Sequence, residues 1–417
     1  MPDGWAWARL ASILSLSSGK SIKVRQLADV GEYPVYGGNG INGTYSDCNV
    51  NTETIVIGRV GYYCGSVYKT ISKAWVTDNA LIATIKEPHV FETDLLVEIL
   101  RYLDLGKTSV STAQPVVSGK GILPLIIPIP PQAQQKNILE SYNSIIPIVD
   151  TIEKNREDVL AVISNIKAKI LDLAIRGKLV PQDPNDEPAS VLLERIRAEK
   201  EELIKQGKIK RDKKESVIFK GDDNSYYLRT DKLIESLDDW RFDELPYNWS
   251  LCCLGEICDY GNCINVDSSS IAESAWILDL EDIEKDTGIV LKKIKKSERN
   301  AASTKHLFHK GQVLYSKLRP YLNKVVLADE DGYCTSEILP LDFSEIIVPE
   351  YARYFLMSPT FLRYANKCSY GVKMPRLGTT DGKKAILSLP PIEEQKRIVI
   401  AIEKAFSSLS SITENLS

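Results

Sequence analysis

The chain has 417 residues, of which 43% are hydrophobic and 26% charged, a globular composition long enough for two domains with connecting helices. Its formal net charge of −4 excludes a surface that binds nucleic acid over its whole area, so any such contact must come from local patches. No apolar run is long enough to cross a membrane, and scattered cysteines without a secretory signal favour a cytoplasmic protein.

Residues 1–131 are predicted to form a mixed α/β domain. The patterns that support it are strand-like runs at 54–57, 66–68 and 81–85, followed by a helical pattern near 93–103. The domain is therefore expected to combine short strands with at least one helix.

A small polar loop, Gly37-Gly38-Asn39-Gly40, follows Tyr36 in this first domain. Its glycines would let backbone amides approach a phosphate, and Asn39 could pair with adenine. A tight turn without any ligand explains the same residues about equally well. The candidate nucleic-acid contacts of the domain are Tyr36, Gly38, Asn39, Arg59, Tyr62, Tyr63 and Lys69.

Residues 132–180 are predicted to contain one long helix. Apolar residues recur there at alternating steps of four and three, which is typical of a coiled-coil seam; its members include Ile138, Ile145, Ile152, Ile163 and Ile170. About 45 residues of helix would be roughly 65 Å long, so a second long helix is needed to cover the seam. Pro147 lies inside the pattern and should kink or split the helix.

Residues 181–240 are predicted to be a linker. Residues 181–188 are rich in chain-breaking prolines, and residues 189–205 have the pattern of an amphipathic helix that Gly207 ends. A basic run at 208–214 follows.

Residues 241–390 are predicted to form a second mixed α/β domain. The supporting patterns are strand-like runs at 276–280, 312–315 and 324–328, with helical residues at 350–364 interrupted by Pro359. Residues 292–324 contain ten Lys or Arg residues and a single acid, Glu298. In an acidic chain, this basic stretch indicates a local patch for nucleic acid.

Two loops of the second domain hold its strongest candidates. Lys317 and Arg319 follow a predicted strand on one face, and Arg319 is the first choice for a bidentate contact to guanine. Lys373 and Arg376 flank a Met-Pro pair in the other loop. The alternative is a solvated basic face. The full set of candidates is Ser316, Lys317, Arg319, Tyr321, Lys324, Lys373 and Arg376.

The two halves of the chain form an internal repeat. Each opens with a short motif, Pro2-Asp3-Gly4-Trp5 in the first half and Pro246-Tyr247-Asn248-Trp249 in the second. Each closes with a Pro-Pro pair and a Gln-Lys pair at a constant offset of 260, which are Pro130-Pro131 with Gln135-Lys136 and Pro390-Pro391 with Gln395-Lys396.

Residues 391–417 repeat the helical seam with Ile398, Ile402 and Leu409. We therefore predict an α/β (α+β) protein in which two related domains are joined by long helices that form an antiparallel coiled coil with pseudo-two-fold symmetry. The second helix is shorter than the first, so part of the seam is left for a partner. Two similar binding faces at a fixed separation suit a DNA target that is split in two.

Signals of catalysis are absent from the sequence. It contains no Gly-x-x-x-x-Gly-Lys-[Ser/Thr] loop for ATP, no glycine-rich turn typical of an S-adenosylmethionine pocket, and no histidine beside a plausible nucleophile and acid. The potential zinc ligands Cys253, Cys258, Cys263, His306 and His309 include no Cys-x-x-Cys pair, so we expect no metal site. The chain is accordingly predicted to be a binding protein and not an enzyme.

The repeated Pro-Pro-x-x-x-Gln-Lys-x-Ile entry to a helix resembles the specificity (S) subunits of Type I restriction–modification systems, as does the run Ile170-Leu171-Asp172-Leu173-Ala174-Ile175-Arg176-Gly177-Lys178-Leu179-Val180-Pro181-Gln182. The segments at 33–43, 57–61 and 77–80 resemble one type of target-recognition domain, and those at 314–321 and 334–337 resemble another. The resemblance covers almost the whole chain, and it departs from the family only where the second helix is short.

The resemblance implies double-stranded DNA, two methyltransferase subunits and restriction subunits as partners, without contact with a membrane. It implies no cofactor on this chain, because S-adenosylmethionine, ATP and magnesium would bind to the partner subunits. A Type IIB-like specificity subunit fits the same residues. Rivals of another class are a single-chain methyltransferase or nuclease, and a coiled-coil scaffold that binds proteins.

Overall fold

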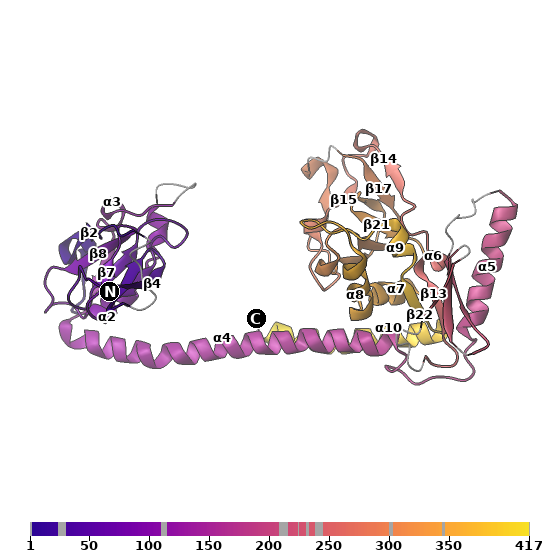
Figure 1. The fold of residues 1–417 in the computed structure, drawn as a ribbon, viewed down its shortest axis with the longest axis horizontal. Coiled ribbons are helices and arrows are strands. Elements are labelled where there is room, and N and C mark those ends of the chain that lie inside the picture. The colour runs from indigo at the N-terminus through magenta and orange to yellow at the C-terminus, as the bar shows by residue number, and fades with distance from the viewer. Residues whose placement is uncertain are drawn as a thin grey trace. The chain divides into compact units, whose positions relative to one another are not determined.

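The computed structural model describes residues 2–23, 31–109, 115–207, 216–223, 225–230, 233–237, 245–299, 303–343 and 347–416. The chain divides into two compact units, Met1–Asn155 and Arg156–Ser417, and the long helix α4 (Gln132–Ile175) contributes to both (Figure 1). Across the described ranges, none of the helices is both long and apolar enough to cross a membrane.

The first unit is built from small sheets and short helices. Its described strands form a four-stranded sheet of order β2-β8-β5-β6, a three-stranded sheet of order β4-β3-β7 and the pair β1-β9. These strands are β1 (Ala6–Arg9), β2 (Leu14–Ser18), β3 (Tyr33–Gly37), β4 (Gly40–Tyr45), β5 (Ile55–Gly58), β6 (Val67–Lys69), β7 (Trp75–Val76), β8 (Ala80–Ile85) and β9 (Ile126–Ile129). The helices are α1 (Leu10–Ile13), α2 (Thr93–Tyr102) and α3 (Gly119–Ile122), with a 3-10 turn, η2 (Leu105–Thr108).

The core of the first unit lies between β5 and α2. All four residues of β5 are buried, because the strand is covered on both faces, and Leu96 and Leu100 present the apolar side of α2 to the same cluster. The predicted strands at 54–57, 66–68 and 81–85 and the helix at 93–103 are confirmed as β5, β6, β8 and α2.

Pro147 was predicted to kink or split the long helix, and the structure shows no split. Helix α4 continues through Pro147 without interruption. Proline removes the hydrogen bond to the carbonyl of Asn143, and because Asn143 is exposed, water can take the place of the missing donor. The Thr151 hydroxyl donates to the Pro147 carbonyl at 2.6 Å, on the other side of the same turn.

The second unit carries a larger set of sheets. Their strand orders are β14-β17-β20-β15-β16, β19-β18-β21, β13-β22 and β10-β11-β12. The strands are β10 (Ser216–Lys220), β11 (Tyr226–Thr230), β12 (Leu233–Ser236), β13 (Ser250–Cys253), β14 (Ile264–Val266), β15 (Trp276–Leu278), β16 (Ile294–Lys295), β17 (Lys305–Phe308), β18 (Val313–Ser316), β19 (Val325–Leu327), β20 (Gly332–Thr335), β21 (Ile338–Leu341) and β22 (Ile386–Leu389).

The helices of the second unit cover these sheets. They are α5 (Ala189–Lys205), α6 (Leu254–Ile257), α7 (Pro349–Met357), α8 (Pro359–Cys368), α9 (Thr379–Lys383) and α10 (Ile392–Asn415), and the short 3-10 turns include η7 (Pro320–Leu322). The predicted strands at 276–280, 312–315 and 324–328 are confirmed by β15, β18 and β19. Pro359 separates α7 from α8 as expected, and Ser358 caps α8 by accepting from the Phe361 amide.

The segment predicted to be a linker contains a folded sheet. Helix α5 covers the predicted residues 189–205, but strands β10, β11 and β12 that follow were not predicted. The inner face of this sheet presents Ile218 and Leu228 to Leu251 and Ile386 of the β13-β22 pair. The basic run at 208–214 lies outside the described residues.

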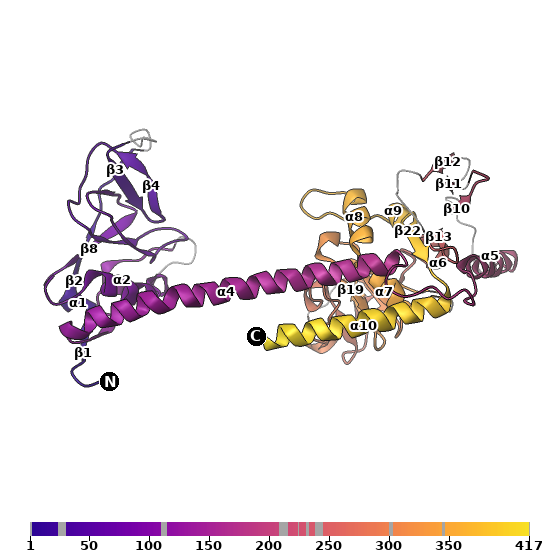
Figure 2. The ribbon, with the colours of Figure 1, turned by 90° about the horizontal axis from the view of Figure 1, so that it is seen from below.

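Helix α10 runs antiparallel to the last part of α4 within the second unit (Figure 2). The first half of α10 packs Ile398 and Ile402 against Leu171 of α4, and further along, the ring of Phe406 lies 5.5 Å from the Lys167 ammonium. The predicted interface residues Ile163 and Ile170 are buried or partly buried, and Leu409 is half-buried. The antiparallel pairing of the two long helices is therefore confirmed.

The predicted seam is not covered along its whole length. Ile145 and Ile152 are 55% and 61% exposed, because α10 is 24 residues long and α4 is 44. Ile138, at the start of α4, packs on the core of the first unit and not on another long helix. The exposure of Ile145 and Ile152 agrees with the expectation that the shorter second helix leaves part of the seam uncovered. The placement of Ile138 in the seam is the part of the prediction that the structure corrects.

The internal repeat has the same structure in both units. Strand β1 pairs with β9, and β13 pairs with β22 at the corresponding place. The opening tryptophan of each half bonds to the residue before the repeated glutamine: Trp5 Nε1 donates to Gln134 at 3.1 Å, and Trp249 Nε1 donates to Glu394 at 2.9 Å. The two motifs recur in the sequence because they contact each other in each unit.

The buried side-chain amide of the repeated glutamine makes the same hydrogen bonds in both units. Gln135 accepts from the Glu92 amide at 2.7 Å, and Gln395 accepts from the Val348 amide at 2.9 Å; both donors are the N-cap residues of helices, α2 and α7. Each glutamine also donates to the first proline carbonyl of its Pro-Pro pair, at 3.1 and 3.0 Å. The motif therefore fixes one helix of the domain to the start of the long helix.

We expect Gln395→Ala to destabilise the second unit by about 1–3 kcal/mol, because a buried amide hydrogen and a buried carbonyl lose their partner. Gln135→Ala provides the matched variant in the first unit. Hydrogen exchange measured by mass spectrometry should show faster exchange in α7 for the first variant and in α2 for the second. Equal loosening of both units by either variant would contradict the assignment.

Candidate nucleic-acid interface

A short turn after β18 is held by three backbone hydrogen bonds. The Lys317 amide donates to Glu337 at 3.0 Å, the Lys317 carbonyl accepts from Leu377 at 3.0 Å, and the Arg319 amide donates to Pro375 at 2.7 Å. These bonds bring the two predicted loops of the second unit together. We call residues 316–319 the second clamped turn.

The first unit contains the same turn after β5. The Arg59 amide donates to Asn79 at 2.8 Å, the Arg59 carbonyl accepts from Val117 at 2.9 Å, and the Gly61 amide donates to Pro115 at 3.0 Å. Residues 58–61 form the first clamped turn. The correspondence places Arg59 where the second unit has Lys317, and Gly61 where it has Arg319.

Arg319 has a backbone conformation that usually requires glycine. Its φ is 49°, in the left-handed region, and the equivalent Gly61 has a φ of 92°. A side chain other than glycine costs about 1–2 kcal/mol there. The Nε of Arg319 is buried and has no hydrogen-bond partner among the described residues. A strained arginine with an unused donor is expected where the side chain has a function.

The structure separates the candidates of the second unit into outward and inward side chains. Tyr321 and Lys373 are exposed, and Lys317 is partly exposed beside Arg319. Ser316 is buried and its hydroxyl donates to the Leu318 carbonyl at 2.9 Å, so its prediction as a DNA contact is contradicted.

Lys324 and Arg376, also predicted as DNA contacts, have partners within the protein. The Lys324 ammonium donates to the Leu280 carbonyl at 2.6 Å, and burial lowers the pKa of this lysine. The Arg376 guanidinium binds Glu337, with an Nη2–Oε1 distance of 2.7 Å, and also donates to the Met374 carbonyl at 3.2 Å. Both cations are therefore bound by groups of the protein itself, and we do not include them among the proposed contacts.

The basic stretch at 292–324 is only partly available as a basic surface. Acids from other segments neutralise several of its cations: Lys293 pairs with Asp329 and Glu330, Lys296 with Glu273, Arg299 with Asp279, Glu281 and Asp282, and Lys305 with Asp279. These acids lie before and after the stretch in the sequence, so folding lowers its local charge excess. Near the second clamped turn, Lys373 is exposed and Lys317 and Arg319 are partly exposed.

In the first unit, the polar loop is the tight turn of a hairpin. Gly37 of β3 pairs with Gly40 of β4, which leaves Gly38 and Asn39 at the tip, and the Asn39 side chain is exposed. Tyr36 is 3% exposed and belongs to the core, so its prediction as a DNA contact is contradicted. The hairpin tip lies near the first clamped turn. A β-carbon placed on Gly58 would be only 2.5 Å from the Gly38 carbonyl oxygen.

Arg59 and Lys69 differ in their availability. Arg59 is partly exposed and makes only weak contacts, at 3.3 Å to the Ser18 hydroxyl and 3.5 Å to the Asp78 carbonyl. Lys69 forms ion pairs with Asp94 at 2.5 Å and Glu53 at 3.1 Å, and the hydrogen bond that it donates to Asp94 raises its pKa. Lys69 therefore already has two acidic partners within the fold, and we do not include it among the proposed contacts.

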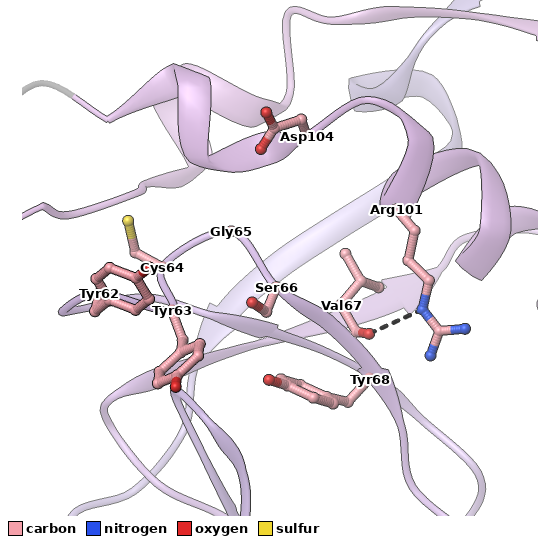
Figure 3. A pocket seen from close by; sticks show the side chains of 9 residues that line it. All are labelled: Tyr62, Tyr63, Cys64, Gly65, Ser66, Val67, Tyr68, Arg101 and Asp104. Atoms are coloured by element: carbon pink, nitrogen blue, oxygen red, sulfur yellow. Dashed lines mark hydrogen bonds between the residues drawn. The ribbon is translucent and has the colours of Figure 1, made fainter. Parts of the chain in front are cut away.

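A hollow of about 510 Å³ opens beside the first clamped turn (Figure 3). Tyr62 is 90% exposed, and its ring packs edge-on against Tyr63 at 5.0 Å between centroids. Tyr68 and Arg101 also line the hollow, and Arg101 Nε donates to the Val67 carbonyl at 3.2 Å. Tyr68 and Arg101 were not predicted from the sequence, because only folding brings α2 and β6 beside the turn.

The cysteines named as potential zinc ligands are packing residues. Cys253 and Cys258 are buried, and burial raises the pKa of both thiols, which keeps them protonated. His306 is buried, its Nδ1 lies 2.8 Å from the Ile338 carbonyl, and burial lowers its pKa. Within the described ranges, no three His, Cys, Asp or Glu side chains form a group that could hold a metal ion.

The chain thus consists of two α+β units with equivalent clamped turns, each connected to a long helix. The family model described as "Type I restriction modification DNA specificity domain" matches residues 2–161 and 246–417, so the chain belongs to this family. The match falls on both units and omits α5 and the β10-β11-β12 sheet.

Individual relatives agree with this assignment. The chain is 22% identical over 421 residues to the Type I restriction enzyme EcoDI specificity subunit of Escherichia coli, covering 100% of this chain and 84% of that protein. It is 32% identical over 265 residues to the EcoAI specificity subunit of Escherichia coli, covering 61% of this chain and 40% of the relative. Both relatives are specificity subunits, in agreement with a recognition protein that is not itself an enzyme.

A solved structure supports the fold. A chain from a structure described as concerning complex assembly and conformational transition of the type I restriction–modification system matches with a TM-score of 0.55 and 13% identity, covering 100% of this chain and 93% of that chain. The predicted fold class, two α+β domains with long helices, is confirmed.

Proposed function

We propose that this chain recognises a duplex DNA target in two parts, one part for each unit. The observation that carries the proposal is the equivalence of the two clamped turns, which present Arg59 in one unit and Lys317 with Arg319 in the other on backbone frames with the same hydrogen-bond pattern. Two equivalent side-chain platforms in one chain suit two half-sites better than one continuous site. Family membership supplies the link to DNA specificity.

The contacts proposed for each half-site follow from exposure. In the first unit these residues are Gly38, Asn39, Arg59, Tyr62 and Tyr63, and in the second they are Lys317, Arg319, Tyr321 and Lys373. Arginine is suited to a bidentate contact with guanine, and asparagine to one with adenine. Exposed tyrosines can pack against sugar or base, and Lys317 and Lys373 would contact phosphates.

We further propose that the chain positions two methyltransferase subunits and the restriction subunits on the target. The exposed seam residues Tyr142, Ile145, Val149 and Ile152 of α4 support this, because a row of apolar side chains on an exposed helix is typical of a helix-binding surface. The partners would carry S-adenosylmethionine, ATP and magnesium.

Lengthening α4 by one heptad tests the two-part proposal. Duplicating residues 149–155 adds seven residues in an exposed part of the helix and returns the seam to nearly the same face. The added length is about 10 Å, which corresponds to about three base pairs. We expect the methylated motif in the host's DNA to keep both half-sites and gain about three base pairs between them. A length-preserving control replaces Glu153 and Lys154 with alanine, and an active enzyme with an unchanged motif would refute the proposal.

A further inference from the structure

A small hairpin next to the second clamped turn protrudes from the second unit. Tyr370 and Arg376 exchange two backbone hydrogen bonds of 3.0 and 2.9 Å, and residues 371–375 form the loop between them. We call residues 370–376 the finger. Val372 at its apex is 101% exposed, and Tyr370 and Met374 are 62% and 44% exposed.

The finger is fixed at its base. The Arg376 guanidinium donates to the Met374 carbonyl at 3.2 Å. Its Nε also donates to Glu337, whose two carboxylate oxygens each lie 3.1 Å away. The Pro375 carbonyl accepts from the Arg319 amide, so the finger and the clamped turn share a hydrogen bond. A loop with these supports holds its apex in one place relative to Arg319, which reduces the entropy lost on binding.

The chemistry of the finger indicates what it binds. Its sequence, Tyr-Gly-Val-Lys-Met-Pro-Arg, has two cations and no acid, in a chain whose net charge is negative. The cation at the apex is Lys373, because Arg376 is neutralised by Glu337. Apolar side chains at the apex with a lysine between them fit a surface that is apolar in the middle and anionic at the rim. The grooves of duplex DNA, with base edges between phosphate backbones, have this character.

We propose that the finger enters a groove of the DNA at the second half-site, where Val372 contacts base edges and Lys373 contacts a phosphate. This inference rests on the proposed function and adds a second reading element beside Arg319. The likeness between finger and groove is one of chemistry: a branched apolar side chain packs against thymine methyl groups or the flat edges of base pairs. Glu337 and Arg376 then act as positioning residues, since their ion pair fixes the base of the finger.

The test uses the full chain purified with its methyltransferase subunits, and duplexes that carry the motif methylated in the host. Val372→Asp and Val372→Ala are compared with Ile289→Asp, which alters a residue of the same unit that is 54% exposed. We expect Val372→Asp to weaken binding by about tenfold or more, through loss of discrimination at the second half-site alone, and Val372→Ala to show a smaller loss in the same place. Ile289→Asp should bind within about twofold of the wild type.

The outcomes separate this inference from the proposed function. If both Val372 variants keep full discrimination at the second half-site while an Arg319 variant loses it, the finger does not touch DNA and the proposed function stands. If the Val372 variants weaken binding to all duplexes equally, the base contact is refuted. If the wild-type complex itself does not discriminate between duplexes, the proposed function fails, and the inference fails with it. Thermal unfolding of each variant verifies that the fold is retained.

Discussion

We expect Arg319→Gly to lose recognition at the second half-site while the protein stays about as stable as the wild type. The guanidinium contact to guanine is worth about 1–3 kcal/mol, or roughly 5- to 150-fold in affinity for that half-site. Glycine relieves the left-handed strain of about 1–2 kcal/mol, and its greater freedom in the unfolded chain costs roughly 0.5–1 kcal/mol. The equivalent position in the first unit is already a glycine, Gly61, so the backbone frame tolerates the change.

Binding to duplexes mutated in one half-site at a time, together with thermal unfolding, measures both parts of this prediction. Arg319→Ala is the matched control, because it removes the same guanidinium but keeps a β-carbon at the strained φ. Arg319→Lys keeps the charge without the bidentate geometry and should lose discrimination as well. A uniform loss of affinity across all sequences would instead make Arg319 a phosphate contact.

The repeated parts of the fold could be predicted from the sequence because the repeated motifs contact each other within each unit. The opening tryptophans, Trp5 and Trp249, and the repeated glutamines, Gln135 and Gln395, recur in the chain because they bond at corresponding places in both units. Strand β5 and helix α2 were predictable from apolar patterning for a similar reason, since a short apolar run and an apolar helix face are both visible in the local sequence. The β10-β11-β12 sheet was missed because its exposed strand β12 has no alternation of buried and exposed residues.

The candidate site was predicted in part. Lys317 and Lys373, 56 residues apart, were proposed from separate loops, and the backbone bonds of the clamped turn place both loops together. Lys69, Lys324 and Arg376 are bound by groups that lie far away in the sequence or on another element, which no local pattern reveals. A cation in a sequence indicates a ligand site only when no acid or carbonyl of the folded protein binds it.

Arg299 illustrates this rule with the largest expected effect on stability. It lies in the basic stretch, yet its side chain is 10% exposed and forms two hydrogen bonds, of 2.6 and 2.7 Å, to the fully buried carboxylate of Asp282. We expect Arg299→Ala to destabilise the second unit by about 3–5 kcal/mol, because it leaves a buried charge without its partner. Chemical denaturation followed by fluorescence measures this, with Lys310→Ala as the exposed control from the same stretch.

Replacing both partners tests whether the buried ion pair adds net stability, or whether each charge is needed only because the other one is buried. Arg299→Met combined with Asp282→Leu removes both charges and keeps similar volumes, so we expect it to recover most of the stability that Arg299→Ala loses. The same double variant should bind DNA with an unchanged salt dependence, since neither side chain faces the solvent beside the clamped turn. If Arg299→Ala folds normally and lowers the slope of log affinity against log salt by about one, the arginine is a phosphate contact, and the basic stretch faces DNA after all.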